Sequence, residues 1–100
     1  MDSEKAITII ISEAEIISLL GAKFIALFGS VARDEARQDS DVDILVEFDE
    51  PPTFDKYMEL KLYLESILNK KVDLVDWDML RPEVRPNVER DIIPIISPSS

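Results

Sequence analysis

The sequence predicts a two-layer α/β fold in which a small mixed β-sheet is covered by helices. A nearly continuous apolar run at residues 23–28 indicates a buried strand, and two later segments that alternate apolar and acidic residues indicate two more. Apolar residues at helical spacing precede the first strand and separate the later two. The chain has 100 residues, which fits one domain. We expect this domain to occupy residues 1–96, followed by a disordered tail at residues 97–100.

The first third of the chain is expected to form a helix, a strand and a short second helix. Asp2 or Ser3 is the candidate N-cap of a helix over Glu4–Leu20, where isoleucine and alanine recur at helical spacing. The sequence KFIALF at Lys23–Phe28 predicts a central strand that is buried on both faces. A Gly-Ser pair ends this strand, and the residues that follow favour a short helix over Val31–Arg37.

The rest of the chain is expected to form two strands, a long helix and an irregular end. Asp41–Phe48 and Val72–Asp76 alternate apolar with acidic residues, as strands do. Between them, Asp55–Leu68 has the apolar spacing of an amphipathic helix. A further helix is expected to start near one of the prolines at positions 82 and 86. Ile92–Ile96 contains Pro94 and therefore predicts an edge strand or an extended tail.

The composition restricts the function. With 11 basic and 21 acidic side chains the net charge is −10, which argues against general binding to nucleic acids or anionic membranes. No apolar stretch approaches the roughly 20 residues of a membrane helix, and the acidic N-terminus is not that of a signal peptide, so we expect the cytoplasm. The chain has no cysteine and no histidine, so a metal would need oxygen ligands, as Mg²⁺, Mn²⁺ and Ca²⁺ prefer.

Two acids near the start of the second strand are candidate metal ligands. Eight acids fall between positions 34 and 50, and such a run is usually a solvated face. Asp41 and Asp43, however, are two residues apart on a strand, which puts both on one face with Cα atoms ~6.5 Å apart. Like charges this close repel each other unless a cation lies between them. An Asp-x-Asp pair is by itself a weak signal.

Three other positions strengthen this interpretation. Asp73 lies inside an apolar strand, where a carboxylate is costly unless it faces water or a cation. Gly29 and Ser30 follow a buried strand directly, and glycine lets the backbone approach a ligand closely while the serine hydroxyl can bond a phosphate oxygen. Arg33 is placed either to reach a phosphate or to pair with a nearby acid.

These residues can meet only in one sheet topology. Ser30 lies at the C-terminal end of its strand, whereas Asp41 and Asp43 lie at the N-terminal end of the next, so these two strands should be antiparallel. The helical connection that follows lets the third strand lie parallel to the second and brings Asp73 to the same end. A mixed sheet satisfies both requirements.

The segment GSVARDEARQDSDVDILVEF resembles the signature of the nucleotidyltransferase superfamily that includes DNA polymerase beta. Gly-Ser is followed by Asp-x-Asp on the next strand and by a third Asp further on. The compact form of the motif, in a chain of this length, is most similar to the minimal nucleotidyltransferases (MNT proteins) of prokaryotes. The resemblance extends from the first helix to about Ile95. One position departs from the family pattern, since Asp34 stands where glycine usually follows the arginine.

The resemblance implies the roles of the site residues. Gly29, Ser30 and Arg33 would bind the nucleotide, while Asp41, Asp43 and Asp73 would be the catalytic acids and ligate two Mg²⁺ ions. The reaction would be the in-line attack of an acceptor hydroxyl on the α-phosphorus of ATP, with release of pyrophosphate. Asp73 would complete the metal site nearest the attacking hydroxyl and help to remove its proton.

The resemblance also implies a partner. MNT proteins often pair with a helical HEPN protein in toxin–antitoxin modules, and the MNT antitoxin transfers AMP to a tyrosine of the toxin. The chain would therefore be a protein adenylyltransferase that acts as an antitoxin, in a homo-oligomer or hetero-oligomer. Residues 81–96, which mix arginines with isoleucines that look exposed, are the candidate docking surface.

Three other functions remain open. A non-catalytic antitoxin would neutralise its partner by binding alone. A receiver domain also clusters acids at a Mg²⁺ site, but it needs five βα units, and about three strands fit here. A nucleotidyltransferase with a small-molecule acceptor usually has a second domain, for which this chain has no room.

Overall fold

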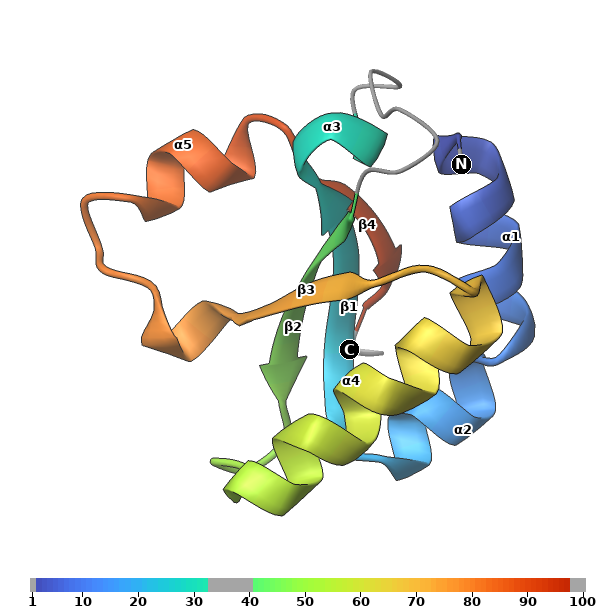
Figure 1. The fold of residues 1–100 in the computed structure, drawn as a ribbon. Helices are drawn as coiled ribbons and strands as arrows, with labels where there is room; N and C mark the ends of the chain where they lie inside the picture. Colours follow the sequence, from blue (N-terminus) through green and yellow to red (C-terminus); the bar gives the residue numbers. More distant parts are fainter. Residues whose placement is uncertain (1, 33–40, 98–100) are drawn as a thin grey trace.

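A computed structural model describes residues 2–32 and 41–97 and shows a four-stranded mixed sheet with helices (Figure 1). The order of the strands across the sheet is β3-β2-β1-β4. The strands are β1 Ala22–Phe28, β2 Val42–Phe48, β3 Val72–Asp76 and β4 Ile93–Ile96. The helices are α1 Ser3–Ser12, α2 Ala14–Leu19, α3 Gly29–Ala32, α4 Phe54–Leu68, the 3-10 turn η1 Trp77–Met79, and α5 Arg85–Glu89. The predicted two-layer α/β fold is confirmed.

The pairing of the strands is the one that the candidate site requires. β1 pairs with β2 antiparallel, and β2 pairs with β3 parallel. β1 also pairs antiparallel with β4, which lies at the edge of the sheet as Pro94 predicted. These antiparallel pairs contradict a receiver domain, whose sheet is parallel. Of the two alternatives predicted for Ile92–Ile96, the edge strand is therefore the correct one.

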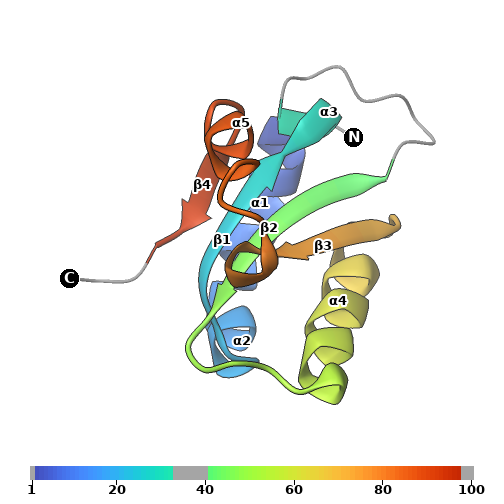
Figure 2. The same ribbon diagram turned by 90° about the vertical axis from the view of Figure 1, so that its left-hand side faces the viewer.

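Helices α1, α2 and α4 lie on one side of the sheet, whereas η1 and α5 lie on the other (Figure 1). Figure 2 views the sheet from the side of η1 and α5. The core lies between the sheet and the first group of helices, where apolar residues of α1, α2 and α4 pack on alternate residues of the strands. Its central members are Ile10, Ile17, Ile25, Leu27, Ile44, Val46, Leu60 and Leu64, all fully buried. No helix in these two described ranges combines the length and apolar character of a membrane span.

The predicted first helix is interrupted at Glu13. Asp2 caps α1 by accepting a hydrogen bond from the Lys5 amide at 2.8 Å, as expected for an N-cap. The Ser12 hydroxyl donates to the Ile9 carbonyl at 2.6 Å, a local bond that competes with the regular helix ladder. The chain turns at Glu13 and continues as α2 to Leu19, and Gly21, just beyond the C-cap Leu20, has a positive φ of 102°. The apolar spacing continues through this break, so periodicity alone could not reveal it.

The C-terminal part corrects one prediction. α5 contains Pro86 in its first turn, as a helix starting near that proline requires. The isoleucines of residues 92–96 are half-buried rather than exposed, because β4 pairs with β1 and packs Ile93, Ile95 and Ile96 against the core. These isoleucines are therefore part of the fold, and the expectation that they are exposed is wrong. The assignment of residues 81–96 as a docking surface stays a prediction. Of the predicted tail, residues 98–100 lie outside the described ranges.

Candidate active site

Two of the predicted catalytic acids are neighbours across the sheet. Asp43 of β2 and Asp73 of β3 are register partners in the parallel pair. The start of this pair is fixed by a hydrogen bond of 2.9 Å from the Val42 amide to the Lys71 carbonyl. Val42 and its register partner Val72 are buried, whereas Asp43 is half-buried and Asp73 is exposed. Because side chains alternate along a strand, the two acids lie on the face opposite to the α1, α2 and α4 layer.

Gly29 brings the end of β1 against the first of these acids. Phe28 is the antiparallel register partner of Asp43, so the next residue comes directly beside the carboxylate. Gly29 has a φ of +71°, which only glycine adopts readily. A Cβ atom at this position would lie 2.1 Å from Asp43 Oδ2 and 2.9 Å from Asp43 Cγ. The glycine is therefore required both by the backbone conformation and by the space that the carboxylate occupies.

The structure describes the other predicted site residues to different extents. Asp41 is exposed and lies one residue before β2. The backbone of Ser30 belongs to α3, next to Gly29. Arg33 lies outside the described ranges, as does Asp34, the residue that departs from the family pattern. Asp76 ends β3, as the predicted strand Val72–Asp76 does, and its side chain caps the turn that follows.

The donor atoms fit a hard divalent cation. Asp43 and Asp73 supply carboxylate oxygens, and the sequence contains no thiolate or imidazole that would favour a softer metal. Among the residues that the structure describes, no group of three or more acids is close enough to hold a metal ion. The geometry thus brings together two of the three predicted ligands, while the third, Asp41, lies at the open end of β2.

Two side chains of α4 hold the strand that carries Asp73. The Glu65 carboxylate accepts a hydrogen bond from the Val72 amide at 2.9 Å, and the Tyr57 hydroxyl donates to the Leu74 carbonyl. These bonds lie immediately before and after Asp73. This role was missed in the sequence, because the segment Asp55–Leu68 served only to predict an amphipathic helix. The available signal was the spacing of eight residues between Tyr57 and Glu65, which puts both on one side of a helix.

The surroundings of Tyr57 change the pKa of its hydroxyl. Burial raises the pKa of Tyr57 above its ordinary value, and the charges of Asp73 and Asp76 raise it further. Both effects disfavour the phenolate. Tyr57 therefore stays protonated and keeps donating to the Leu74 carbonyl throughout the neutral range.

Comparison with known proteins identifies relatives. Residues 5–100 match the family model described as Polymerase beta, Nucleotidyltransferase. The protein adenylyltransferase MntA of Thermococcus cleftensis is 43% identical over 79 residues, which are 79% of this chain and 80% of that protein. A Methanocaldococcus jannaschii protein whose name proposes a protein adenylyltransferase is 51% identical over 74 residues, 71% of this chain and 74% of that protein.

The solved structures that are similar to this chain include nucleotidyltransferases and toxin–antitoxin complexes. A structure described as that of a proposed minimal nucleotidyltransferase has a TM-score of 0.82 and 41% identity, covering 94% of this chain and 96% of the other. A toxin–antitoxin structure with AMP-PNP has a TM-score of 0.69 and 29% identity, covering 85% and 73%. A tri-AMPylated Shewanella oneidensis HEPN toxin in complex with its MNT antitoxin gives a TM-score of 0.61 and 28% identity, covering 85% and 69%.

Proposed function

The chain belongs to the polymerase beta nucleotidyltransferase family, and from this premise we propose that it transfers AMP from ATP to a hydroxyl of a partner protein. We propose further that the acceptor is a tyrosine of a HEPN toxin and that the chain acts as its antitoxin. The observation that carries the proposal is the constellation of Gly29, Asp43 and Asp73 in a member of this family. The similarity to the MntA adenylyltransferase and to complexes of HEPN toxins with MNT antitoxins supports the choice of acceptor.

Each site residue has a role in this reaction. We assign binding of the ATP phosphates to Gly29, Ser30 and Arg33. The carboxylates of Asp41, Asp43 and Asp73 would hold two Mg²⁺ ions, which when bound would stabilise the charge on the attacking and leaving oxygens. The acceptor oxygen forms a bond to the α-phosphorus as the bond to the β-phosphate oxygen breaks, and pyrophosphate leaves. Asp73, which is exposed, accepts the proton of the hydroxyl.

The acceptor is supplied by the partner, because the described part of this chain consists of one small sheet and the helices around it. We propose the cytoplasm as the compartment, since it provides ATP and Mg²⁺ together. In this reading the complex is a hetero-oligomer of antitoxin and toxin. Transfer of AMP to the toxin tyrosine would then inactivate the toxin.

The test is to incubate the purified chain with a HEPN protein from the same organism, ATP labelled at the α-phosphate, and Mg²⁺. We expect label on the HEPN protein with the wild type and a loss of at least ~10²-fold with Asp43→Asn. Ser30→Ala should cost roughly 1–3 kcal/mol of transition-state binding, the size of a hydrogen bond to a charged group. If Asp43→Asn neutralises the toxin as well as the wild type does, the alternative of a non-catalytic antitoxin that acts by binding is correct.

A further inference from the structure

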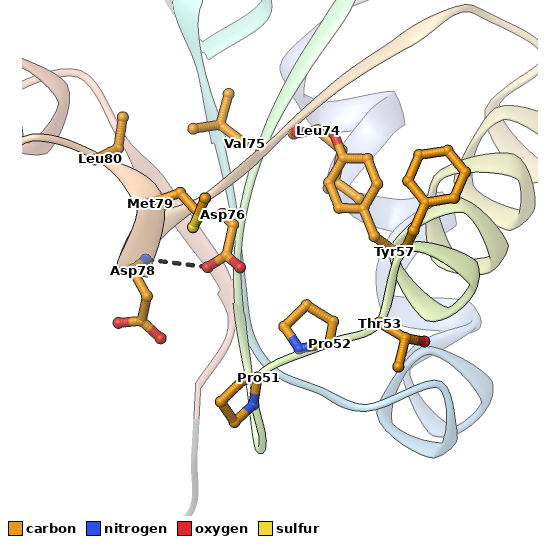
Figure 3. Close-up of a pocket in the computed structure, with 11 residues that line it drawn as sticks. Pro51, Pro52, Thr53, Tyr57, Leu74, Val75, Asp76, Asp78, Met79 and Leu80 are labelled. Carbon is orange, nitrogen blue, oxygen red and sulfur yellow. Dashed lines mark hydrogen bonds between the residues drawn. The ribbon is translucent and has the colours of Figure 1, made fainter.

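A cavity lies beside the outer strand β3 and is lined by none of the residues assigned to the candidate active site. It has a volume of about 600 Å³ and lies where the start of α4, the end of β3 and η1 meet (Figure 3). This volume is in the range of protein ligand pockets. The lining consists of Pro51, Pro52, Thr53, Phe54, Tyr57, Leu74, Val75, Asp76, Asp78, Met79 and Leu80. None of the residues assigned to nucleotide or metal binding is among them.

The cavity and the two acids use different residues of β3. Leu74 is buried on the helix side of the sheet and contributes to the cavity, whereas the preceding Asp73 is exposed on the other face. Adjacent residues of a strand point to opposite faces. Val75, which also lines the cavity, lies on the face of Asp73, so the cavity is at the end of β3 and touches both faces while sharing no residue with the site formed by Asp43 and Asp73.

The walls of the cavity are held in place by the fold. Pro51 and Pro52 form one wall and have restricted backbones. Tyr57 is fixed by its hydrogen bond to the Leu74 carbonyl. The Asp76 carboxylate accepts a hydrogen bond from the Asp78 amide at 3.0 Å, which fixes the turn opposite the prolines. A pre-formed cavity needs little ordering when a ligand binds, and this favours affinity.

The charged residues that line the cavity favour a positively charged ligand. In Figure 3 the Asp76 carboxylate points into the space between η1 and the prolines. Burial raises the pKa of Asp76, so this carboxylate is poorly solvated when ionised. Asp78 is the other charged residue of the lining, which includes no basic residue. An anion would be repelled, whereas a cation would compensate the cost of the desolvated carboxylate.

The surroundings of the cavity indicate a protein rather than a small molecule. Phe54 and Met79 both line it, yet they remain 77% and 82% exposed. Large apolar side chains that stay in water around a cavity are typical of protein interaction sites. Aromatic residues and methionine are enriched in protein interfaces, where apolar contacts surround a few buried polar anchors.

We propose that this cavity is a docking site for a partner protein that inserts an arginine or lysine side chain flanked by apolar residues. The basic group pairs with the Asp76 carboxylate, and the flanking residues pack on Phe54 and Met79. The apolar stem of the inserted side chain lies along Pro51 and Pro52. This docking uses none of the residues assigned to nucleotide or metal binding.

The test uses three acetylated and amidated tripeptides as probes, with sequences Leu-Arg-Leu, Leu-citrulline-Leu and Leu-Glu-Leu. Citrulline keeps the shape of arginine and removes its charge. Binding is followed by NMR through the methyl groups of Leu74, Met79 and Leu80, without ATP or Mg²⁺. We expect saturable shifts with the arginine peptide and a dissociation constant on the order of 1 mM. The other two peptides should bind at least about fivefold more weakly.

Variants separate the two parts of the proposal. Asp76→Asn keeps an oxygen that can accept the hydrogen bond of the Asp78 amide, and it should weaken binding of the arginine peptide at least about fivefold. Glu59→Gln changes an exposed acid of α4 outside the cavity and should leave this binding unchanged. Met79→Ser should weaken the binding of the arginine peptide and of the citrulline peptide by similar factors. Equal affinity for all three peptides, or shifts that do not saturate, would overturn the proposal. The chain could also form dimers that the arginine peptide dissociates. That result would overturn the proposal too, because the occupant of the cavity would then be a second copy of the chain.

Discussion

Asp43 and Asp73 are register partners, so two acids that are distant in the sequence are brought side by side by the backbone pairing of β2 and β3. Neither acid depends on a loop for its position, because both lie inside strands whose alternate residues are buried. Removing the charge of either one should therefore change the chemistry of the site and leave the fold intact.

The first prediction concerns these acids and Asp41. Asp41→Asn, Asp43→Asn and Asp73→Asn should each lower AMP transfer by at least ~10²-fold, because charge stabilisation at the transferred phosphate depends on them. Transfer is measured with labelled ATP and the partner protein. Glu59→Gln, at an exposed acid of α4 outside both the site and the cavity, is the control and should keep the wild-type rate. If Asp43→Asn transferred AMP at the wild-type rate, Asp43 would not be a catalytic residue.

The second prediction concerns the contact between Gly29 and Asp43. Gly29→Ala places a Cβ atom 2.1 Å from Asp43 Oδ2 at a φ of +71°, so it should lower the free energy of unfolding by at least about 2 kcal/mol and abolish transfer. Gly21→Ala is the control, since its φ is +102° but its Cβ would meet only Phe48 at 3.7 Å. It should cost about 1–2 kcal/mol and leave transfer unchanged. Denaturant unfolding and transfer assays on both variants provide the comparison, and equal loss of transfer would refute the role of the contact.

The third prediction concerns Mg²⁺ and stability. Mg²⁺ should raise the melting temperature of the wild type with concentration, because it binds the folded site and little of the unfolded chain. Asp43→Asn should be at least as stable as the wild type without Mg²⁺, since it removes one of several repelling charges, and should respond less to Mg²⁺. Thermal melts at zero and millimolar Mg²⁺ and constant ionic strength measure both effects. Parallel shifts in the two proteins would show that Asp43 is not a ligand.

The fourth prediction concerns the hydrogen bond from the Val72 amide to Glu65. Glu65→Ala leaves a half-buried amide without its acceptor and should cost about 1–2 kcal/mol of unfolding free energy. Glu65→Gln keeps an acceptor oxygen and should cost less than half of that. The ion pair with Lys61, at 4.0 Å and partly exposed, contributes little. Faster hydrogen exchange at Val72 in Glu65→Ala, but not in Glu59→Ala, would identify the bond; equal exchange in both would refute it.

The fifth prediction concerns pH and Asp76. Burial raises the pKa of Asp76, so in the range between its unfolded and folded pKa values the folded state binds more protons than the unfolded state. Stability from this group is therefore highest at low pH and is lost as the pH rises through that range. The Asp76→Asn variant has no ionisable group at this position and therefore does not lose stability in this way. Its stability relative to the wild type should increase between about pH 3 and pH 7, and a constant difference in melts across that range would contradict the shift.

The topology of the sheet could be predicted because the chemistry of the site constrains it. Requiring Ser30, Asp43 and Asp73 to meet was sufficient to predict an antiparallel β1–β2 pair and a parallel β2–β3 pair, and both are confirmed. The fourth strand was recognisable as an edge strand from Pro94, but its place beside β1 was not, since Ile92–Ile96 would suit either edge.

Other features depend on contacts between elements and leave no local signal. The break of the first helix at Glu13 coincides with a hydrogen bond of 2.5 Å from the Tyr63 hydroxyl to the Glu13 carboxylate, 50 residues away. The cavity around Asp76 likewise combines three segments, and in the sequence Asp76 is only the last residue of a strand. Periodicity reports which face of an element is buried, but it does not report where two elements leave a gap.

The hydrogen bonds from α4 to β3 have a consequence for the behaviour of the protein at high concentration. An outer strand with unpaired amides and carbonyls can add a strand from another molecule and so begin aggregation. Here the Val72 amide and the Leu74 carbonyl, which point away from β2, are already bonded to Glu65 and Tyr57. Intermolecular strand addition at β3 would first have to break both bonds, so α4 protects the molecule from polymerising through this strand.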